Sequence, residues 1–409
     1  MKDLVILGGG TAGSMMANKL VRALPEGWRI TVVDKDDLHV YQPGLLFLPF
    51  GQYDRRDIVK KRGRQLDPDV RYVVGTIDRV DVDAKVVALA GGEQLSWDLL
   101  IVATGTDIDP AQTEGLTDPA LWQQSAFDFY TLDGASKLAA ALERFEGGRL
   151  VIHVVDMPIK CPVAPLEFAF LADAFFTERG MRDQVELVFA TPLDGAFTKP
   201  RAKATLGDLL TTRGIHIEPE LVVSHVDPGR KVVHGYGDRE VDFDLLVSVP
   251  AHVGATPMRT SGLGDDLGFV PTHKHTLQSL AHPDIFVLGD ATDLPTSKAG
   301  AVAHFQGDVL LPNILRHIDG RELLPDFDGH ANCFIETGHG KAMLIDFNYD
   351  TEPLPGRFPL PGVGPFTLLE ESRVNHLGKL AFKWVYWNFL VKGKELPLEH
   401  RMTTAGKWS

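Results

Sequence analysis

The first fourteen residues, MKDLVILGGGTAGS, constrain the fold of this chain more than any other stretch. Residues 4–7 are an apolar run of strand length, which leads into Gly8, Gly10 and Gly13 in a G-x-G-x-x-G spacing. Residues 14–24 then read as a helix. A strand, a glycine turn and a helix N-terminus in this order predict a pyrophosphate site, because the backbone can approach the phosphates and the helix dipole faces them.

An acidic residue lies where a ribose-binding carboxylate is expected. Residues 29–33 read as a second strand, and Asp34 follows it about 20 residues after the glycine turn. Glycine-rich turns are common in proteins, but this one has the strand before it and the acid after it. The context therefore favours a dinucleotide site over a merely structural turn.

Composition and charge narrow the class of protein. A chain of 409 residues suits two or three domains, and its formal net charge of −14, with no basic cluster, argues against a nucleic-acid partner. No apolar run reaches the roughly 18 residues of a membrane-spanning helix. The first strand starts at residue 3, which leaves no room for a signal peptide and favours the cytoplasmic side. The histidines at 272–275 lack a third ligand, so we expect no metal site.

Two later strands end in turns of small residues that suit a cofactor. The strand WDLLIVAT closes with Ala103 and Thr104 before Gly105, and the strand IFVL is followed by Gly289 and Asp290. Such turns let the backbone lie against a ligand. Together with the glycine turn they resemble the three signatures of the two-dinucleotide-binding-domain flavoproteins. The resemblance implies FAD as the cofactor, with the aspartate of the third signature holding its ribityl chain.

A second nucleotide-binding domain is expected, but without a nucleotide fingerprint. Residues 149–155 read as its first strand, after which residues 156–165 (DMPIKCPVAP) contain three prolines and none of the fingerprint glycines. A pyrophosphate cannot approach such a backbone closely. The sequence therefore predicts that an NADH site is absent, and we expect residues 243–249 to return the chain toward the first domain.

The chain has two cysteines, Cys161 and Cys333, and taken singly each is either an inert buried thiol or part of one redox couple. Cys161 stands before Pro162 and a helical stretch at 165–176, so it should lie near a helix N-terminus. The helix dipole and the charge of Lys160 would then lower the pKa of the Cys161 thiol. Cys333 lies in the strand-like run HANCFIETG.

The run KCPVAPLE at residues 160–167 looks like the KCPxAPxE signature of the sulfide:quinone oxidoreductases. These enzymes belong to the same flavoprotein superfamily, as does the flavoprotein subunit of flavocytochrome c sulfide dehydrogenase. The resemblance covers nearly the whole chain. The other matching positions are the glycine turn, Tyr41-Gln42-Pro43, Ala103-Thr104-Gly105, Gly289-Asp290, Ser297-Lys298, Cys333 and the aromatic tail.

The resemblance implies roles for four residues. Cys161 and Cys333 would face each other over the flavin as a disulfide or a sulfur-bridged pair, which hydrosulfide attacks. Cys333 would then be the thiolate that passes two electrons to the flavin. Glu167 would be an acid or base near the sulfur, and Lys298 would stabilise the reduced flavin from the start of a helix over residues 296–317.

The sequence departs from the family pattern at two places. Many members carry a third cysteine in the stretch that corresponds to residues 122–132, which here has none. The position that binds FAD covalently in the flavocytochrome subunit matches Gln42, so FAD should be non-covalent. Pro43 is expected at the cofactor, within an apolar loop at 40–50 that either lines the cofactor or substrate channel or packs in the core.

The C-terminal stretch at 368–392 reads as an amphipathic helix, with Trp and Tyr beside Lys, as at a membrane interface. The alternative is a helix docked on the protein's own core or on a second copy of the chain. Lys379 is among the basic residues off the apolar stripe. Phe334, Phe347 and Tyr349 are candidates to stack on a quinone ring. The stripe itself comprises Val374, Leu377, Leu380, Ala381, Trp384 and Val385.

These elements predict an α/β protein with two Rossmann-like dinucleotide-binding domains and a C-terminal membrane-docking region. Residues 351–366 are rich in proline and glycine and read as a linker. The expected limits are 1–110 with 245–320 for a discontinuous FAD-binding domain, 111–244 for the second Rossmann-like domain, and 321–409 for the C-terminal region.

The expected function is FAD-dependent oxidation of sulfide to polysulfide or sulfur, with electrons passed to a membrane quinone. The expected partners are hydrogen sulfide, the quinone, the lipid surface and a possible second copy of the chain, with the protein peripheral on the cytoplasmic face of the cell membrane. Three alternatives remain open. They are a flavocytochrome-type sulfide dehydrogenase, a type II NADH:quinone dehydrogenase and a non-catalytic redox-sensing flavoprotein.

Overall fold

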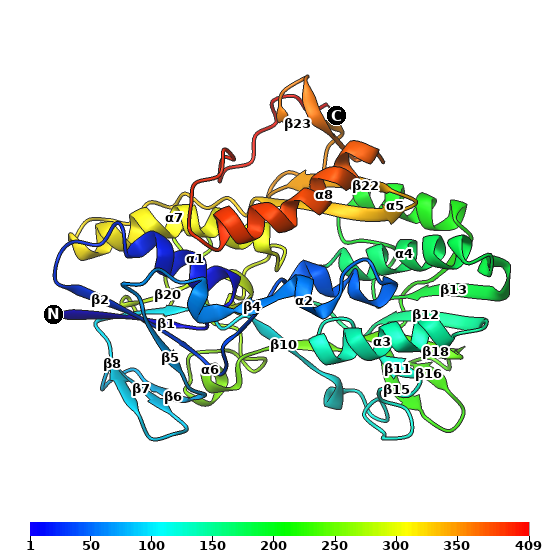
Figure 1. Ribbon diagram of the computed structural model, residues 1–409, viewed down its shortest axis with the longest axis horizontal. Helices are drawn as coiled ribbons and strands as arrows, with labels where there is room; N and C mark the ends of the chain where they lie inside the picture. The colour runs from blue at the N-terminus through cyan, green and yellow to red at the C-terminus, as the bar shows by residue number, and fades with distance from the viewer. Residues whose placement is uncertain (409) are drawn as a thin grey trace.

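The chain folds around two five-stranded parallel β-sheets that lie side by side along the long axis of the molecule (Figure 1). The computed structural model describes residues 1–408. The strand order is β20-β9-β1-β2-β5 in the first sheet and β11-β18-β12-β13-β14 in the second. Two parallel sheets with helical crossovers confirm the predicted α/β class with two Rossmann-like units.

The glycine turn begins at the centre of the first sheet. β1 (Lys2–Leu7) pairs with β2 (Trp28–Asp34) on one side and with β9 (Leu99–Val102) on the other. The last four residues of β1 are buried, as expected for a central strand that is covered on both faces. β5 (Arg71–Val74) and β20 (Ile285–Val287) form the two edges.

Two helices of the first unit pack against each other beside this sheet. α1 (Thr11–Leu20) begins directly after the glycine turn, three residues earlier than the sequence predicted, and ends before Pro25. α7 (Gly300–Ile318) packs on α1. The predicted helix at 296–317 therefore begins later than expected, and Lys298 lies in the turn before it.

The second sheet corrects one expectation. Residues 243–249 do not lead back to the first sheet, because β18 pairs in parallel with β12 and β11 near the centre of the second sheet. The chain returns only afterwards, where β19 (Ala251–Gly254) pairs with β10 (Thr106–Asp109). The strands of this sheet are β11 (Ala126–Phe127), β12 (Gly148–Val154), β13 (Val185–Ala190), β14 (Ile215–Glu218) and β18 (Leu245–Val249).

The second unit has three helices, α3 (Leu132–Arg144), α4 (Ala164–Glu178) and α5 (Pro200–Thr212). α4 is buried on almost every side, since it packs against β12, β13 and a strand of the C-terminal region. Its apolar sequence APLEFAFLADAFF therefore suits a helix enclosed within the protein. This helix follows the Cys161 loop.

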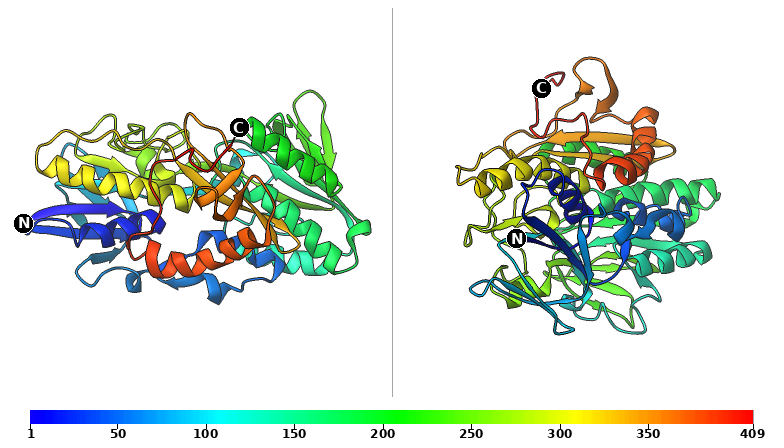
Figure 2. Two further views of the ribbon diagram at one scale, coloured as in Figure 1. Left: turned by 90° about the horizontal axis from the view of Figure 1, so that it is seen from above. Right: turned by 60° about the vertical axis from the view of Figure 1, so that its left-hand side comes forward.

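The C-terminal region is a four-stranded sheet with a helix, and it lies across the junction of the two units (Figures 1 and 2). The predicted linker at 351–366 is wrong, because most of it forms a hairpin of this sheet. The elements are β21 (Ala331–Gly338), β22 (Lys341–Phe347), β23 (Gly356–Leu360), β24 (Gly364–Leu368), α8 (Arg373–Val385) and a π-helical turn (Tyr386–Leu390).

Short elements connect these units. Residues 77–89 contain the two strands of a hairpin. The apolar loop at 40–50 is largely buried, in two 3₁₀ turns, Gln42–Leu45 and Leu48–Phe50. The remaining elements are β3 (Leu38–Val40), β4 (Val59–Lys61), β6 (Ile77–Asp81), β7 (Val86–Leu89), β8 (Gln94–Ser96), β15 (Val223–Asp227), β16 (Val232–Gly235), β17 (Glu240–Asp242), α2 (Arg55–Ile58), α6 (Thr256–Thr260) and 3₁₀ turns at Arg62–Arg64, Pro110–Gln112, Arg182–Gln184 and Gly289–Ala291.

The largest hydrophobic core is continuous between the two sheets and the C-terminal strands. It contains β1, α4 and β21 side chains such as Leu4, Phe168 and Ile335, each fully buried. We propose that the three domains expected from the sequence are the units that share this core. The second domain then extends to Val249, so that it includes β18.

Candidate active site

The glycine turn has the three properties that a pyrophosphate site requires. Gly8 has a φ of +94°, and a Cβ there would lie 2.4 Å from Ala103 O. A Cβ on Gly13 would lie 1.9 Å from Gly8 O, so a side chain cannot fit between helix and strand. Gly10, by contrast, has nothing within 4 Å of a Cβ position. The turn is therefore closed on the protein side and open on the side where phosphates approach.

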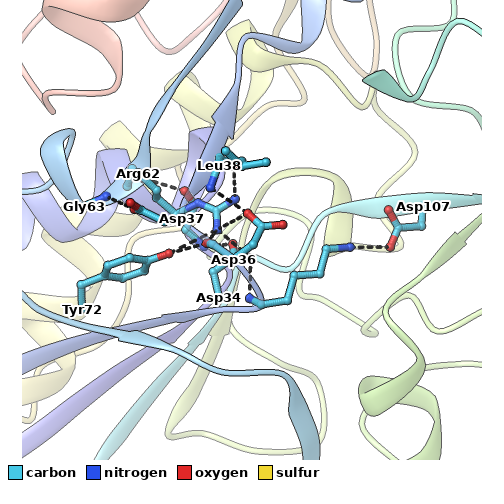
Figure 3. A network of polar contacts seen from close by, with 11 residues as sticks. Asp34, Asp36, Asp37, Leu38, Arg62, Gly63, Tyr72 and Asp107 are labelled. Carbon is cyan, nitrogen blue, oxygen red and sulfur yellow. Dashed lines mark hydrogen bonds and ion pairs between the residues drawn. The ribbon is translucent and has the colours of Figure 1, made fainter. Parts of the chain in front are cut away.

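Asp34 already forms an ion pair with an arginine side chain, a contact that the sequence did not predict. Arg62 Nη1 lies 2.8 Å from Asp34 Oδ1, and Gly9 N donates to Asp34 Oδ2 at 2.7 Å. The same guanidinium donates to Leu38 O at 2.6 Å and lies beside Tyr72, as Figure 3 shows. A ribose hydroxyl at Asp34 would have to share the carboxylate with these two donors, so its role in ribose binding stays a proposal.

The turn after β20 places an acid and a lysine close together. Asp290 follows Gly289, whose φ is +70°, and burial raises the pKa of the Asp290 carboxyl. Lys298 Nζ donates to the backbone carbonyls Asp290 O at 2.9 Å and Thr292 O at 2.6 Å. Burial lowers the pKa of Lys298 to about 8. Lys298 is thus a buried cation anchored to this turn.

The Cys161 loop joins the two units. Cys161 N donates to Lys298 O at 2.7 Å, and Ala164 N donates to Cys161 O at 2.9 Å at the start of α4. Cys161 itself has a φ of +51° in the left-handed region. The hydrogen bond to Lys298 holds the Cys161 loop against the turn that precedes α7. Gln42, next to the half-buried Pro43, reaches the same loop, with its Oε1 3.3 Å from Lys160 Nζ.

The expected lowering of the Cys161 pKa is wrong. Burial raises the pKa of the Cys161 thiol, and the Lys379 charge and the N–H groups of Ala164 and Val163 oppose that rise without overcoming it. The helix N-terminus therefore lowers the pKa of the Cys161 thiol, but desolvation raises that pKa by more. The cation that lowers the pKa of Cys161 is Lys379 and not Lys160, whose own pKa is lowered by burial.

Cys333 lies on β21 opposite Ile345, and its side chain is 7% exposed. Burial raises its pKa, and the neighbouring Cys161 raises it further. Both cysteines are free thiols in the structure. A disulfide or sulfur bridge between them therefore stays a proposal, for which their mutual electrostatic influence and shared hydrophobic core are the support.

Glu167 is not a free acid or base, because it forms a buried ion pair that the sequence did not predict. Its Oε1 contacts Lys379 Nζ, and the two side chains are 2% and 10% exposed. Lys379 also donates to Phe334 O at 3.1 Å, next to Cys333. Burial lowers the pKa of Lys379 to about 7, while Cys161 acts to raise it.

A signal for Lys379 was present in the sequence. Asn375, Lys379, Phe382 and Tyr386 recur at helical spacing on the side of α8 that faces the protein, and Asn375 and Tyr386 are buried. Reading only the apolar residues of this stretch selected the opposite side of the helix. Lys379, which lies on the side of the helix that faces the protein, was therefore not identified as a site residue.

The structure does not bring the three quinone candidates together. Phe334 and Phe347 point to opposite faces of the β21–β22 sheet, since Phe334 shares its face with Leu344 and Phe347 with Ala331. Phe334 packs against Phe366, with ring centroids 5.1 Å apart. Tyr349 lies beyond β22 and donates its hydroxyl to Lys274 O at 3.2 Å. These three cannot stack on one ring, so they are at most alternatives.

Four of the six residues of the apolar stripe of α8 face solvent. Val374, Leu377 and Trp384 are 46%, 63% and 62% exposed, and Ala381 between them is exposed as well. The alternative that this stripe packs on the protein's own core is therefore wrong for these residues. No helix within residues 1–408 is long and apolar enough to cross a membrane.

Comparisons with known proteins find related sequences and the same fold. Residues 2–155 match the model of the pyridine nucleotide-disulphide oxidoreductases. The chain is 24% identical to the mitochondrial sulfide:quinone oxidoreductase of Mus musculus and 27% identical to that of Dictyostelium discoideum, over 96% of this chain and 86% of each relative. The solved structure of the sulfide:quinone oxidoreductase of Aquifex aeolicus superposes with a TM-score of 0.80, at 20% identity, over 96% of this chain and 92% of that chain.

The fold and the open glycine turn define a flavoprotein with the architecture of the pyridine nucleotide-disulphide oxidoreductases. Within that class, the chain is similar to mitochondrial sulfide:quinone oxidoreductases over 95–96% of its length, at 24–27% identity. The family resemblance that the KCPVAPLE run indicated is confirmed.

Proposed function

We propose that this protein oxidises sulfide through Cys161 and Cys333 and passes the electrons through FAD to a membrane quinone. The observation that carries the proposal is the convergence of both cysteines with the Lys379–Glu167 pair and the Lys298 turn at the junction of the two units. Neither unit could form this site alone. The two relatives that match over 96% of the chain are both named sulfide:quinone oxidoreductases.

The residues present fit non-covalent FAD. The open side of Gly10 leaves room for the pyrophosphate, and the buried Thr104 hydroxyl has no hydrogen-bond partner among the described residues. Asp290 offers a carboxylate for the ribityl hydroxyls. FAD, when bound, supplies two-electron chemistry between the sulfur site and the quinone. Lys298 would hold positive charge beside the cofactor.

The electrostatics favour Cys161, and not Cys333, as the thiolate. The Lys379 charge and two backbone N–H groups stabilise a Cys161 thiolate, whereas no cation or hydrogen-bond donor lowers the pKa of Cys333. A thiol with the lower pKa leaves a disulfide faster. In the oxidised protein, hydrosulfide would therefore bond to Cys333 Sγ as the Cys161–Cys333 bond breaks, leaving a persulfide on Cys333 and a thiolate on Cys161.

We propose that α8 docks on the lipid surface where the quinone resides. Its exposed apolar stripe can enter the acyl boundary of the bilayer. Lys383, Lys392 and Lys394 lie along the same C-terminal segment and can contact anionic headgroups. The negative surface of the cytoplasmic leaflet suits this charge, so we propose docking on that face.

The test is steady-state turnover of the FAD-loaded protein with sulfide and a short-chain quinone. We expect sulfide-dependent reduction of the quinone, and no quinone reduction when NADH replaces sulfide, because residues 156–165 lack a glycine fingerprint. Turnover with NADH alone would favour the type II NADH dehydrogenase. Flavin reduction by sulfide without any quinone reduction would favour a cytochrome acceptor.

A further inference from the structure

A cavity of about 270 Å³ lies beneath α8, between α4 and the turn that joins β21 to β22. Apolar side chains line much of it, among them Phe50, Phe175 and Leu380. Four titratable residues line it as well, namely Glu178, His339, Glu336 and His376. Neither Glu336 nor His376 has a part in the sulfur chemistry described above.

Glu336 is the unusual residue among those that line the cavity. Its side chain is 1% exposed, and its Oε1 lies 2.7 Å from His376 Nδ1. Its second oxygen, Oε2, is buried without a hydrogen-bond partner among the described residues. The proton of the Glu336–His376 hydrogen bond can reside on either atom, so the pair can exchange one proton without moving. His376 is 19% exposed and can pass that proton outward.

Glu336 is also tied to the cysteine site. Its backbone N–H donates to Glu167 Oε1 at 2.6 Å, and Glu167 is the partner of Lys379. Lys379 in turn donates to Phe334 O and influences the pKa of Cys161. A series of contacts therefore extends from Cys161 through Lys379 and Glu167 to the backbone of Glu336, whose side chain lines the cavity.

The proposed reaction needs such a connection. Oxidation of HS⁻ to sulfane sulfur releases two electrons and one proton, and reduction of a quinone to a quinol takes up two electrons and two protons. Each turnover therefore draws one proton from solvent to a site that the protein encloses. A buried carboxyl beside a half-exposed histidine is a suitable group to conduct it.

We propose that Glu336 and His376, with the cavity beneath α8, form the proton-exchange route between solvent and the buried Lys379–Glu167 pair during quinone reduction. This inference rests on the proposed function. It assigns the pair a role in moving protons and no contact with sulfide.

The surroundings of Glu336 support its role as a proton carrier. Burial raises the pKa of Glu336 to about 8 and lowers that of His376, so at neutral pH the pair holds one proton in a mainly uncharged form. The other ionisable groups that face it are Lys379 on α8, Glu167 and the rim residue Glu178 on α4, His339 in the β21–β22 turn, and Tyr53 in the loop after Phe50.

The test compares Glu336→Gln with a matched control in the FAD-loaded full chain. Glutamine keeps the size and a hydrogen bond to His376 but cannot carry the proton. We expect flavin bleaching by sulfide to proceed as in the wild type, and reoxidation by a short-chain quinone to slow by about 10- to 100-fold. Glu178→Gln, at the exposed rim of the same cavity, should leave both steps unchanged.

A pH profile separates a proton route from a structural effect. Wild-type reoxidation should slow as the pH rises through about 8, where Glu336 loses its proton, and Glu336→Gln should lose this dependence. His376→Gln should slow the same step, and Glu336→Asp should restore part of the rate. If Glu336→Gln and His376→Gln reoxidise at the wild-type rate with the wild-type profile, the route is wrong. If the wild type itself fails to turn over sulfide with quinone, the proposed function fails instead.

Discussion

At the scale of single residues, one buried ion pair decides the charge around Cys161. Lys379 is the cation that opposes the burial of the Cys161 thiol, and Glu167 is the anion that keeps Lys379 in place. Two charges that are this deeply buried are stabilised mainly by each other, so removing one leaves the other uncompensated. The pair therefore affects both the stability of the fold and the reactivity of the thiol.

Replacing Lys379 with methionine should reduce both stability and activity. The uncompensated Glu167 carboxylate is expected to cost about 3–5 kcal/mol in the free energy of unfolding, and flavin bleaching by sulfide should slow because the Cys161 thiolate loses its cation. Denaturant unfolding and anaerobic stopped-flow absorbance measure the two effects. Lys394→Met, at an exposed position, is the matched control.

A double variant distinguishes the two roles. Glu167→Gln together with Lys379→Met removes both charges, so most of the stability should return while bleaching stays slow. If the double variant bleaches at the wild-type rate, Lys379 does not act on the thiol.

The buried Glu336 predicts a pH dependence of stability with a definite sign. Its pKa is raised from 4.5 to about 8 in the folded chain, so between these values the folded state binds more protons than the unfolded state. Stability should therefore fall as the pH rises through this window, by at most about 1.4 kcal/mol per pH unit from this group. Glu336→Gln should lose this contribution.

Thermal unfolding between pH 5 and pH 9 measures this effect. The melting temperature of Glu336→Gln should rise relative to that of the wild type as the pH increases to about 8, because only the wild type has a carboxyl that ionises in the unfolded state while it stays protonated in the folded state. A constant difference across the range would mean that the pKa of Glu336 is the same in the folded and unfolded states.

At the scale of elements, α8 has two different faces. The inward face bears Lys379 and the buried Asn375, and the outward face bears the exposed Val374, Leu377 and Trp384. Because water is a poor solvent for a continuous apolar stripe, the outward face suits a lipid surface.

Leu377→Glu should therefore weaken binding to liposomes. A carboxylate in the centre of the stripe opposes insertion into the acyl boundary and repels anionic headgroups. Cosedimentation with anionic vesicles measures the effect, while FAD content reports on the fold. Leu280→Glu is the control, since Leu280 is 64% exposed against 63% for Leu377 but lies in the loop before β20. Equal loss of binding in both variants would contradict docking through α8.

The sequence predicted the elements that a short local pattern identifies. It did not predict the strands whose place depends on pairing with strands far away along the chain. The glycine turn, β1, α1 and the amphipathic α8 each have a signature within a few residues. The place of β18 depends on β11 and β12, which lie far away along the chain, so its apolar run alone could not indicate the sheet. The hairpin β23–β24 was read as a linker because prolines and glycines are typical of hairpins and of linkers alike.

The candidate site was predictable to a similar extent. The KCPVAPLE run identified Cys161 and Glu167, and the separate strand of Cys333 was recognised through the resemblance. Lys379 was overlooked although it recurs at helical spacing with buried residues of α8. Arg62 and Glu336 were not predicted, because their contacts form only when elements distant in sequence pack together. For the same reason burial, which reverses the expected pKa shift of Cys161, has no local signal.

At the scale of the whole molecule, the C-terminal segment reaches back to the glycine turn. The Tyr386 hydroxyl lies 2.8 Å from Thr11 Oγ1 at the start of α1 and 2.7 Å from His39 Nε2 on β3. Tyr386 is 1% exposed, so both contacts are shielded from water. The C-terminal segment, for which we propose lipid docking, is thereby linked directly to the helix that would face the pyrophosphate.

Tyr386→Phe should therefore weaken the retention of FAD. Removing the hydroxyl leaves Thr11 and His39 without this partner, at a cost of about 1–3 kcal/mol, and loosens the start of α1. Release of flavin on dilution, followed by fluorescence, measures the change, and Tyr236→Phe at a 70% exposed position is the control. Unchanged retention in Tyr386→Phe would mean that the C-terminal segment does not support the cofactor turn.

The proposed mechanism requires both cysteines to carry electrons from sulfide to the flavin. Anaerobic stopped-flow absorbance of the FAD-loaded protein mixed with sulfide tests this for the wild type, Cys161→Ala and Cys333→Ala. We expect rapid bleaching of the wild-type flavin and none in either variant, with FAD content unchanged. Bleaching that survives both substitutions, or a wild-type flavin that does not respond to sulfide, would contradict it.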